Sequence, residues 1–199
     1  MKSVRAFGIL ILLAAFSAAA ADSEPSALVK SNVDEVLAVI KQSKDKRALH
    51  DLAEQKISRH FDFQAMTRFA MGRSWREASP EQQRRLEKAF RGLLVKTYTD
   101  ALSQSQLADV AVDVKPAQLK PAQDEVTVRS VARQSGKQPV SIDYRMARTD
   151  NGWKVVDVIV ENLSLVMNYR DSFAAEIGRS GIEGLIKTIE AKNQTLASA

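Results

Sequence analysis

Few residues in the 199-residue chain are of types that carry out catalysis or bind metal ions. There are two histidines, His50 and His60, and no cysteine. Their ten-residue spacing matches neither the i, i+4 histidine pair of a helical zinc site nor a zinc finger. The sequence also has no G-x-S-x-G turn for a nucleophilic serine and no glycine-rich phosphate loop. We therefore expect no metal site, no cofactor and no catalytic activity.

Two carboxylates keep an enzymatic alternative open. Asp143 and Asp157 are the nearest candidates for the isolated acid or base that an enzyme acting on an apolar small molecule needs. Asp143 stands between Ile142 and Tyr144 in a segment of strand-like alternation. Because successive side chains of a strand point to opposite faces, we expect Asp143 to face away from these two neighbours.

The composition indicates a globular protein stabilised by its core alone. Hydrophobic residues make up 45% of the chain and charged residues 27%, which excludes disordered and collagen-like chains. Without cysteine, disulfides cannot contribute. A formal charge of +5 would suit nucleic acid or an anionic membrane. However, the sequence lacks the basic and aromatic stripe that binding to single-stranded nucleic acid requires.

The amino terminus has the three parts of a secretory signal peptide. Lys2 and Arg5 precede the apolar run 6–16, and Ala19-Ala20-Ala21 forms a small-residue cleavage site. The run is shorter than the ~20 residues that a membrane span needs. We predict that residues 1–21 are cleaved on export, which lowers the formal charge from +5 to +3 by removing two basic residues.

The mature chain, residues 22–199, is predicted to be one domain with helices over 26–105, strands over 109–161 and helices over 164–196. Apolar residues recur at helical spacing in the first part. Asp62 is placed to cap one helix. Ser79-Pro80-Glu81-Gln82 is a capping box with proline at the first helical position, and it predicts the start of a long amphipathic helix.

Strand-like alternation begins after the long helix. The segments 110–114, 126–129 and 140–147 alternate apolar and polar residues, and 149–152 has the composition of a tight hairpin turn. The segment 153–161 is apolar on both faces, as in a strand that is covered on both sides. These patterns predict an α+β fold, in which a curved antiparallel sheet of four or more strands and a helical subdomain enclose an apolar cavity.

Several stretches, in order across the mature chain, carry a resemblance to one family of exported bacterial proteins. The chain resembles the MlaC family, also called the toluene-tolerance auxiliary family. Asn162 stands where the family usually has glycine, and asparagine tolerates the same left-handed backbone. The stretches are Phe61-Asp62-Phe63, Met66-Thr67-Arg68, Met71-Gly72-Arg73-Ser74-Trp75, Glu81-Gln82 with Phe90 and Thr97-Tyr98, Val140 to Tyr144, Gly152 to Val158, Ser164-Leu165-Val166, Asn168-Tyr169-Arg170 with Phe173, and Gly181 to Ile186.

The resemblance implies an NTF2-like sheet and a periplasmic phospholipid-binding shuttle that maintains the lipid asymmetry of the outer membrane. The implied partners are an outer-membrane lipoprotein-porin complex and the periplasm-facing substrate-binding component of an inner-membrane ABC transporter. A chaperone-like carrier of outer-membrane lipoproteins or unfolded outer-membrane chains is the alternative to a lipid carrier.

Apolar residues on the inward faces are the candidate lipid contacts, although periodicity alone leaves open whether each belongs to an ordinary packed core. Four arginines are candidates for the headgroup or for docking, with a solvated surface as the alternative, since guanidinium binds phosphate in a bidentate fork. For Arg170 a structural pairing with Asp157 is also open. The candidate lipid contacts are Phe63, Met66, Phe90, Leu94, Tyr98, Val126, Val128, Val140, Ile142, Tyr144, Val166, Tyr169 and Phe173. The arginines are Arg73, Arg76, Arg145 and Arg170.

Overall fold

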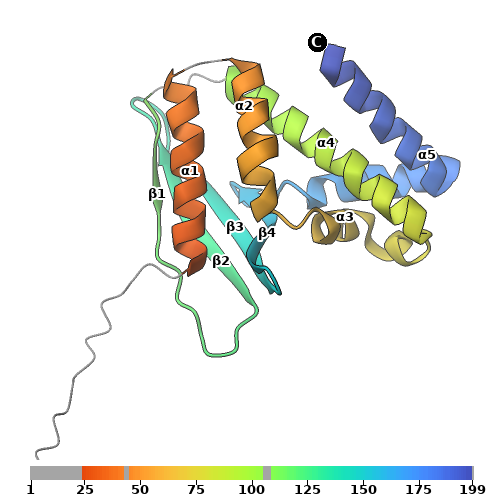
Figure 1. The fold of residues 1–199 in the computed structure, drawn as a ribbon, viewed down its shortest axis with the longest axis horizontal. Coiled ribbons are helices and arrows are strands. Elements are labelled where there is room, and N and C mark those ends of the chain that lie inside the picture. The colour runs from red at the N-terminus through yellow and green to blue at the C-terminus, as the bar shows by residue number, and fades with distance from the viewer. Residues whose placement is uncertain (1–23, 43–44, 105–108, 199) are drawn as a thin grey trace, which may run out of the picture.

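The computed structural model describes residues 24–42, 45–104 and 109–198, and it confirms the α+β fold (Figure 1). The predicted signal peptide, residues 1–21, lies outside the described residues. In chain order, the elements before the sheet are α1 (Glu24–Gln42), α2 (Lys46–Leu52), the π-helical η1 (Ala53–Ile57), the 3-10 turn η2 (Ser58–His60), α3 (Phe63–Met71), the 3-10 turn η3 (Gly72–Arg76) and α4 (Pro80–Gln104).

Side-chain caps fix the starts of α3 and α4 where the sequence predicts them. Asp62 Oδ1 accepts a hydrogen bond from the Ala65 backbone N–H at 2.8 Å. At α4, the Gln82 N–H donates to Ser79 Oγ at 3.2 Å, and the Ser79 N–H donates to Gln82 Oε1 at 3.0 Å. These reciprocal bonds satisfy backbone donors that the first turn of a helix leaves without partners.

In the described part of the chain, five strands form one antiparallel sheet in the order β1-β2-β3-β4-β5. Asp150 and Asn151 form the turn between β3 and β4, and Gly152, the first residue of β4, has a φ of 86°. The register of β3 and β4 shifts between Arg145 and Met146, where a β-bulge bends the sheet. The strands are β1 (Ala111–Val114), β2 (Glu125–Arg133), β3 (Val140–Thr149), β4 (Gly152–Val160) and β5 (Leu163–Ser164).

The chain after β4 differs from the predicted helix beginning at residue 164. Ser164 lies in β5, and a 3-10 turn, η4 (Met167–Tyr169), precedes α5 (Arg170–Ser198). Ser164 Oγ donates to Asp157 Oδ2 at 2.7 Å and accepts from the Met167 N–H at 2.9 Å, so it ties this segment to the sheet. Asn162 has a φ of 67°, the left-handed backbone that its residue type permits. Within α5, Gly181 has the non-helical backbone angles φ 70° and ψ −179°, so this element consists of two helices that meet at Gly181.

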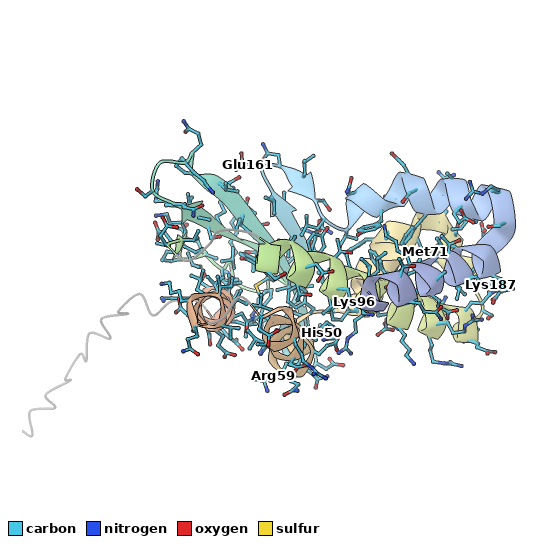
Figure 2. All side chains as sticks on the ribbon, turned by 90° about the horizontal axis from the view of Figure 1, so that it is seen from above. His50, Arg59, Met71, Lys96, Glu161 and Lys187 are labelled. Atoms are coloured by element: carbon cyan, nitrogen blue, oxygen red, sulfur yellow. The ribbon has the colours of Figure 1, made fainter. Side chains whose placement is uncertain are left out.

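Two hydrophobic cores lie side by side. One is formed by α3, η3, α4 and α5, and the other by α1 with β2, β3 and β4. Figure 1 shows α1 and α2 in front of the sheet and the remaining helices beside it. In Figure 2, Lys96 of α4 lies next to α5, where its Nζ donates to the Asn193 carbonyl at 2.8 Å.

Phe61 joins the two cores. Its half-buried ring packs against both clusters, and its backbone forms a bridge to Val155 of β4. The Asp62 N–H donates to the Val155 carbonyl at 2.9 Å. The chain between η2 and α3 is therefore fixed to the sheet directly beside the cap of α3.

Candidate functional site

An apolar cavity of about 560 Å³ lies between the sheet and the helices α1, α2 and α4. Its volume falls within the range of small-molecule sites. Aliphatic and aromatic side chains form most of its wall, as expected of a site for an apolar ligand. No helix within residues 24–42, 45–104 and 109–198 has the length and apolarity needed to cross a bilayer.

One wall of the cavity is the inner face of α1. Five aliphatic residues lie on one face of this helix and line the cavity along roughly 16 Å of its length: Val29, Val33, Val36, Leu37 and Ile40. Val29 is also part of the packed core beneath the helix.

Hydrogen bonds through Ser26 anchor the first turn of α1 to the chain that follows β1. The Ala117 N–H donates to Ser26 Oγ at 2.8 Å, and this hydroxyl contacts the Lys115 carbonyl at 3.4 Å. The start of α1 is therefore held in place, while the apolar stripe beyond it faces the cavity.

The opposite wall is one face of the sheet. Ile142 is paired with Val160, and Tyr144 with Val158, across β3 and β4. All four residues line the cavity. Because cross-strand partners share a face, alternation along β3 directs Ile142 and Tyr144 inward and leaves Asp143 on the other face.

Aromatic rings line the part of the cavity that adjoins the helical core. Phe61 and Phe63 stack with their ring centroids 5.8 Å apart. The Arg91 guanidinium lies 5.5 Å from the Phe63 ring centroid and pairs with Glu54. This part of the wall is continuous with packed protein.

The remaining wall carries a run of polar residues at the turn between β2 and β3. Arg133, Gln134, Lys137 and Gln138 all line the cavity there, whereas the residues of α1 that face it are almost entirely aliphatic. Arg133 and Lys137 are exposed to solvent. The cavity therefore has an apolar interior and a polar, solvent-facing end.

The two tyrosines in the cavity wall stay neutral at physiological pH. Burial raises the pKa of Tyr144 to about 12, and a hydrogen bond with Ser130 partly opposes this effect. Burial also raises the pKa of Tyr98, and the nearby Tyr169 hydroxyl raises it further. The phenol groups thus add no charge to the apolar part of the wall.

The structure brings about half of the predicted lipid contacts together on the cavity wall. These seven come from α3, α4 and β3: Phe63, Met66, Leu94, Tyr98, Val140, Ile142 and Tyr144. The other six lie in packed cores instead. Phe90, Val166, Tyr169 and Phe173 belong to or pack against the helical core, and Val126 and Val128 belong to the sheet core.

The four predicted arginines lie elsewhere, and none is among the described residues that line the cavity. Arg145 stacks on Phe69, with its guanidinium carbon 4.9 Å from the ring centroid. Arg170 extends over Gly72 and approaches the Met167 sulfur at 3.9 Å. Arg73 and Arg76 are exposed on η3.

The two carboxylates of the enzymatic alternative are also absent from the lining among the described residues. Asp157 is 1% exposed and serves as a structural acceptor. It takes a hydrogen bond from Ser164 Oγ at 2.7 Å and one from the Val166 N–H at 3.4 Å. No group of three or more metal-ligating side chains gathers among the residues that the structure describes.

Sequence comparison assigns the chain to a family. The family model described as MlaC protein matches residues 30–191, which include the whole cavity wall except Val29. The chain belongs to the MlaC family. This MlaC-family chain is also 27% identical over 197 residues to the toluene tolerance protein ttg2D of Pseudomonas putida, covering 96% of this chain and 90% of that protein.

A solved structure shares the fold of this MlaC-family chain. It is that of a phospholipid-binding protein from Ralstonia solanacearum in complex with a phospholipid, with a TM-score of 0.76 and 37% sequence identity. The match covers 86% of this chain and 98% of the other. The predicted α+β arrangement, a curved antiparallel sheet with a helical subdomain, is thus shared with a protein that was solved in complex with a phospholipid.

Among the cavity residues that sequence reasoning missed, α1 supplies the largest group from any one element. The stripe from Val29 to Ile40 indicates an apolar face, but periodicity does not show whether such a face borders a cavity or a packed core. The length of this apolar stripe is the feature of the sequence that could have indicated a cavity wall. Most of its members remain partly exposed, because they face open space and not packed side chains.

Proposed function

We propose that this MlaC-family protein is a periplasmic carrier that buries the acyl part of a phospholipid in the cavity between α1, α4 and the sheet. The observation that carries the proposal is the 560 Å³ apolar cavity. It occurs in a chain that is 37% identical to a protein solved with a phospholipid. The signal peptide predicted at residues 1–21 supports export.

The energetics fit a carrier that binds hydrocarbon. Hiding one methylene from water is worth about 0.8 kcal/mol, so an acyl chain of ~16 carbons gains on the order of 10 kcal/mol on burial. A wall of aliphatic residues can provide that gain without leaving polar groups unpaired. The neutral Tyr98 and Tyr144 hydroxyls add no charge to the apolar part of the wall.

The partners that the family resemblance implies complete the proposed role. We propose that the carrier exchanges phospholipid with an outer-membrane lipoprotein-porin complex and with the periplasm-facing component of an inner-membrane ABC transporter. In this role it helps to maintain outer-membrane lipid asymmetry. A passive carrier delivers according to the relative affinities of its partners.

A carrier explains the cavity better than an enzyme does. Asp157, the buried carboxylate, already accepts hydrogen bonds from Ser164 and Val166 outside the cavity wall. A general acid or base must be within hydrogen-bonding reach of its substrate. We therefore propose that the protein binds and releases its ligand without chemical conversion.

Mass spectrometry of the native protein tests this proposal. The protein is expressed with its signal peptide, released from the periplasm, purified without detergent and extracted with organic solvent. A diacyl phospholipid in near-stoichiometric amount is the expected result. Recovery of an empty protein that instead captures acylated lipoprotein would replace the proposal with the chaperone-like alternative.

A further inference from the structure

The polar end of the cavity, at the turn between β2 and β3, is a second chemical feature of the binding site. Arg133 is the last residue of β2, and Lys137 lies four residues further along the turn. Both line the cavity and both are exposed. A phospholipid with its tails inside the cavity must leave its phosphate where water and cations meet the apolar wall.

Neither cation forms an ion pair within 4 Å among the described residues. The acidic side chains closest to them are already engaged. Asp113 pairs with Lys115, which lowers the pKa of this carboxyl, and the charge of Arg133 lowers the same pKa further. Asp109 accepts a hydrogen bond from Gln134 Nε2 at 2.6 Å, which lowers the pKa of this carboxyl, and the charge of Lys137 lowers the same pKa further.

The other acid near this end is Glu161, which directly follows the cavity-lining Val160. Its Oε1 accepts the Ser141 backbone N–H at 2.5 Å. Each of the three acids therefore already accepts a hydrogen bond or pairs with a cation. Arg133 and Lys137, in contrast, pair with no carboxylate among the described residues. An anion arriving at the turn would supply the missing acceptor.

We propose that the phosphodiester of the bound phospholipid lies at the β2–β3 turn, where Arg133 and Lys137 bind it. This inference rests on the proposed function and adds the position of the headgroup. Arginine offers a bidentate fork to phosphate oxygens, and lysine offers a compact point charge. The site recognises the phosphate that all phospholipids share, and it leaves the rest of the headgroup in water.

A competition between two lipids with identical acyl chains tests the assignment. The purified full-length mature protein is incubated with phosphatidylcholine vesicles that contain equal amounts of phosphatidylglycerol and diacylglycerol. The protein is re-isolated, and mass spectrometry gives the ratio of the two bound lipids. A misfolded variant loses both lipids, so the ratio reports on the phosphate alone.

The double variant Arg133→Gln/Lys137→Gln is expected to lower the ratio of phosphatidylglycerol to diacylglycerol by roughly 2- to 5-fold for each charge removed. The matched control Arg73→Gln/Arg76→Gln also removes two exposed charges. Both lie on η3 and neither lines the cavity, so this variant leaves the ratio unchanged. Asp109→Asn raises the ratio, because Lys137 then loses a competing anion. This increase cannot arise from damage to the fold.

Two outcomes overturn the inference. One is an unchanged ratio in the Arg133→Gln/Lys137→Gln variant while both lipids are still bound. The other is an equal fall of the ratio in the Arg73→Gln/Arg76→Gln control, which would assign the preference to the net charge of the protein and not to the turn. If the wild type takes up neither lipid, the proposed function itself fails.

Discussion

Ile142→Trp tests whether the space between α1 and β3 is a ligand cavity. Ile142 lines this cavity, so the larger ring has room to enter it. A tryptophan there displaces about three methylenes of an acyl chain, at about 0.8 kcal/mol each. The loss of ~2.4 kcal/mol corresponds to roughly 60-fold weaker lipid binding. The free energy of unfolding should stay unchanged or rise, since the ring fills empty space.

Met146→Trp is the matched control on the same strand and the same face. Met146 is 0% exposed and belongs to the packed sheet core. Overpacking such a site costs about 1–3 kcal/mol of stability. Native mass spectrometry of bound lipid, combined with urea unfolding, separates the two effects. The reasoning is refuted if Ile142→Trp destabilises the protein as much as Met146→Trp does while retaining its lipid.

Three further predictions concern pH and local structure. Because burial raises the pKa of Tyr144 to about 12, its stabilising contribution is full below pH ~10 and is lost between about pH 10 and 12. Tyr144→Phe should flatten that decline in urea unfolding measured from pH 8 to 11. Asp157→Ala should lower the free energy of unfolding by about 2 kcal/mol, and Ser164→Ala by about 1 kcal/mol, with less than additive loss in the double variant. Gly72→Ala should destabilise the protein more than Gly136→Ala in thermal unfolding. Both glycines have positive φ, which costs alanine about 1–2 kcal/mol, but only at Gly72 does a Cβ meet a side chain, at 2.9 Å from Arg170 Nη2.

Local chemistry made the helix starts and the strands predictable. The carboxylate of Asp62 and the Ser79–Gln82 pair act on backbone groups within three residues, so the sequence contains all the partners needed. Alternation along 140–147 likewise determines which side chains share a face. The segment after β4 could not be predicted in this way, because Ser164 is held by Asp157 on a neighbouring strand.

The candidate site was only half predictable, for a geometric reason. Periodicity identifies an inward-facing residue but does not say whether the space it faces is filled. Ile142 and Met146 have the same place in the alternation of β3, yet one borders the cavity and the other is packed. The bulge beside Met146 and the course of α1 decide between these outcomes, and both depend on contacts distant in sequence.

Phe61 connects the cavity to both hydrophobic cores. Its ring touches the sheet core and the helical core, and it also forms part of the cavity wall. Binding free energy gained in the cavity therefore also stabilises α5, which contributes to the helical core but has no residue among the described cavity lining. We expect the amide protons of α5 to exchange more slowly in the filled carrier. A docking protein that grips only the helical side would then distinguish a full carrier from an empty one without reaching the lipid.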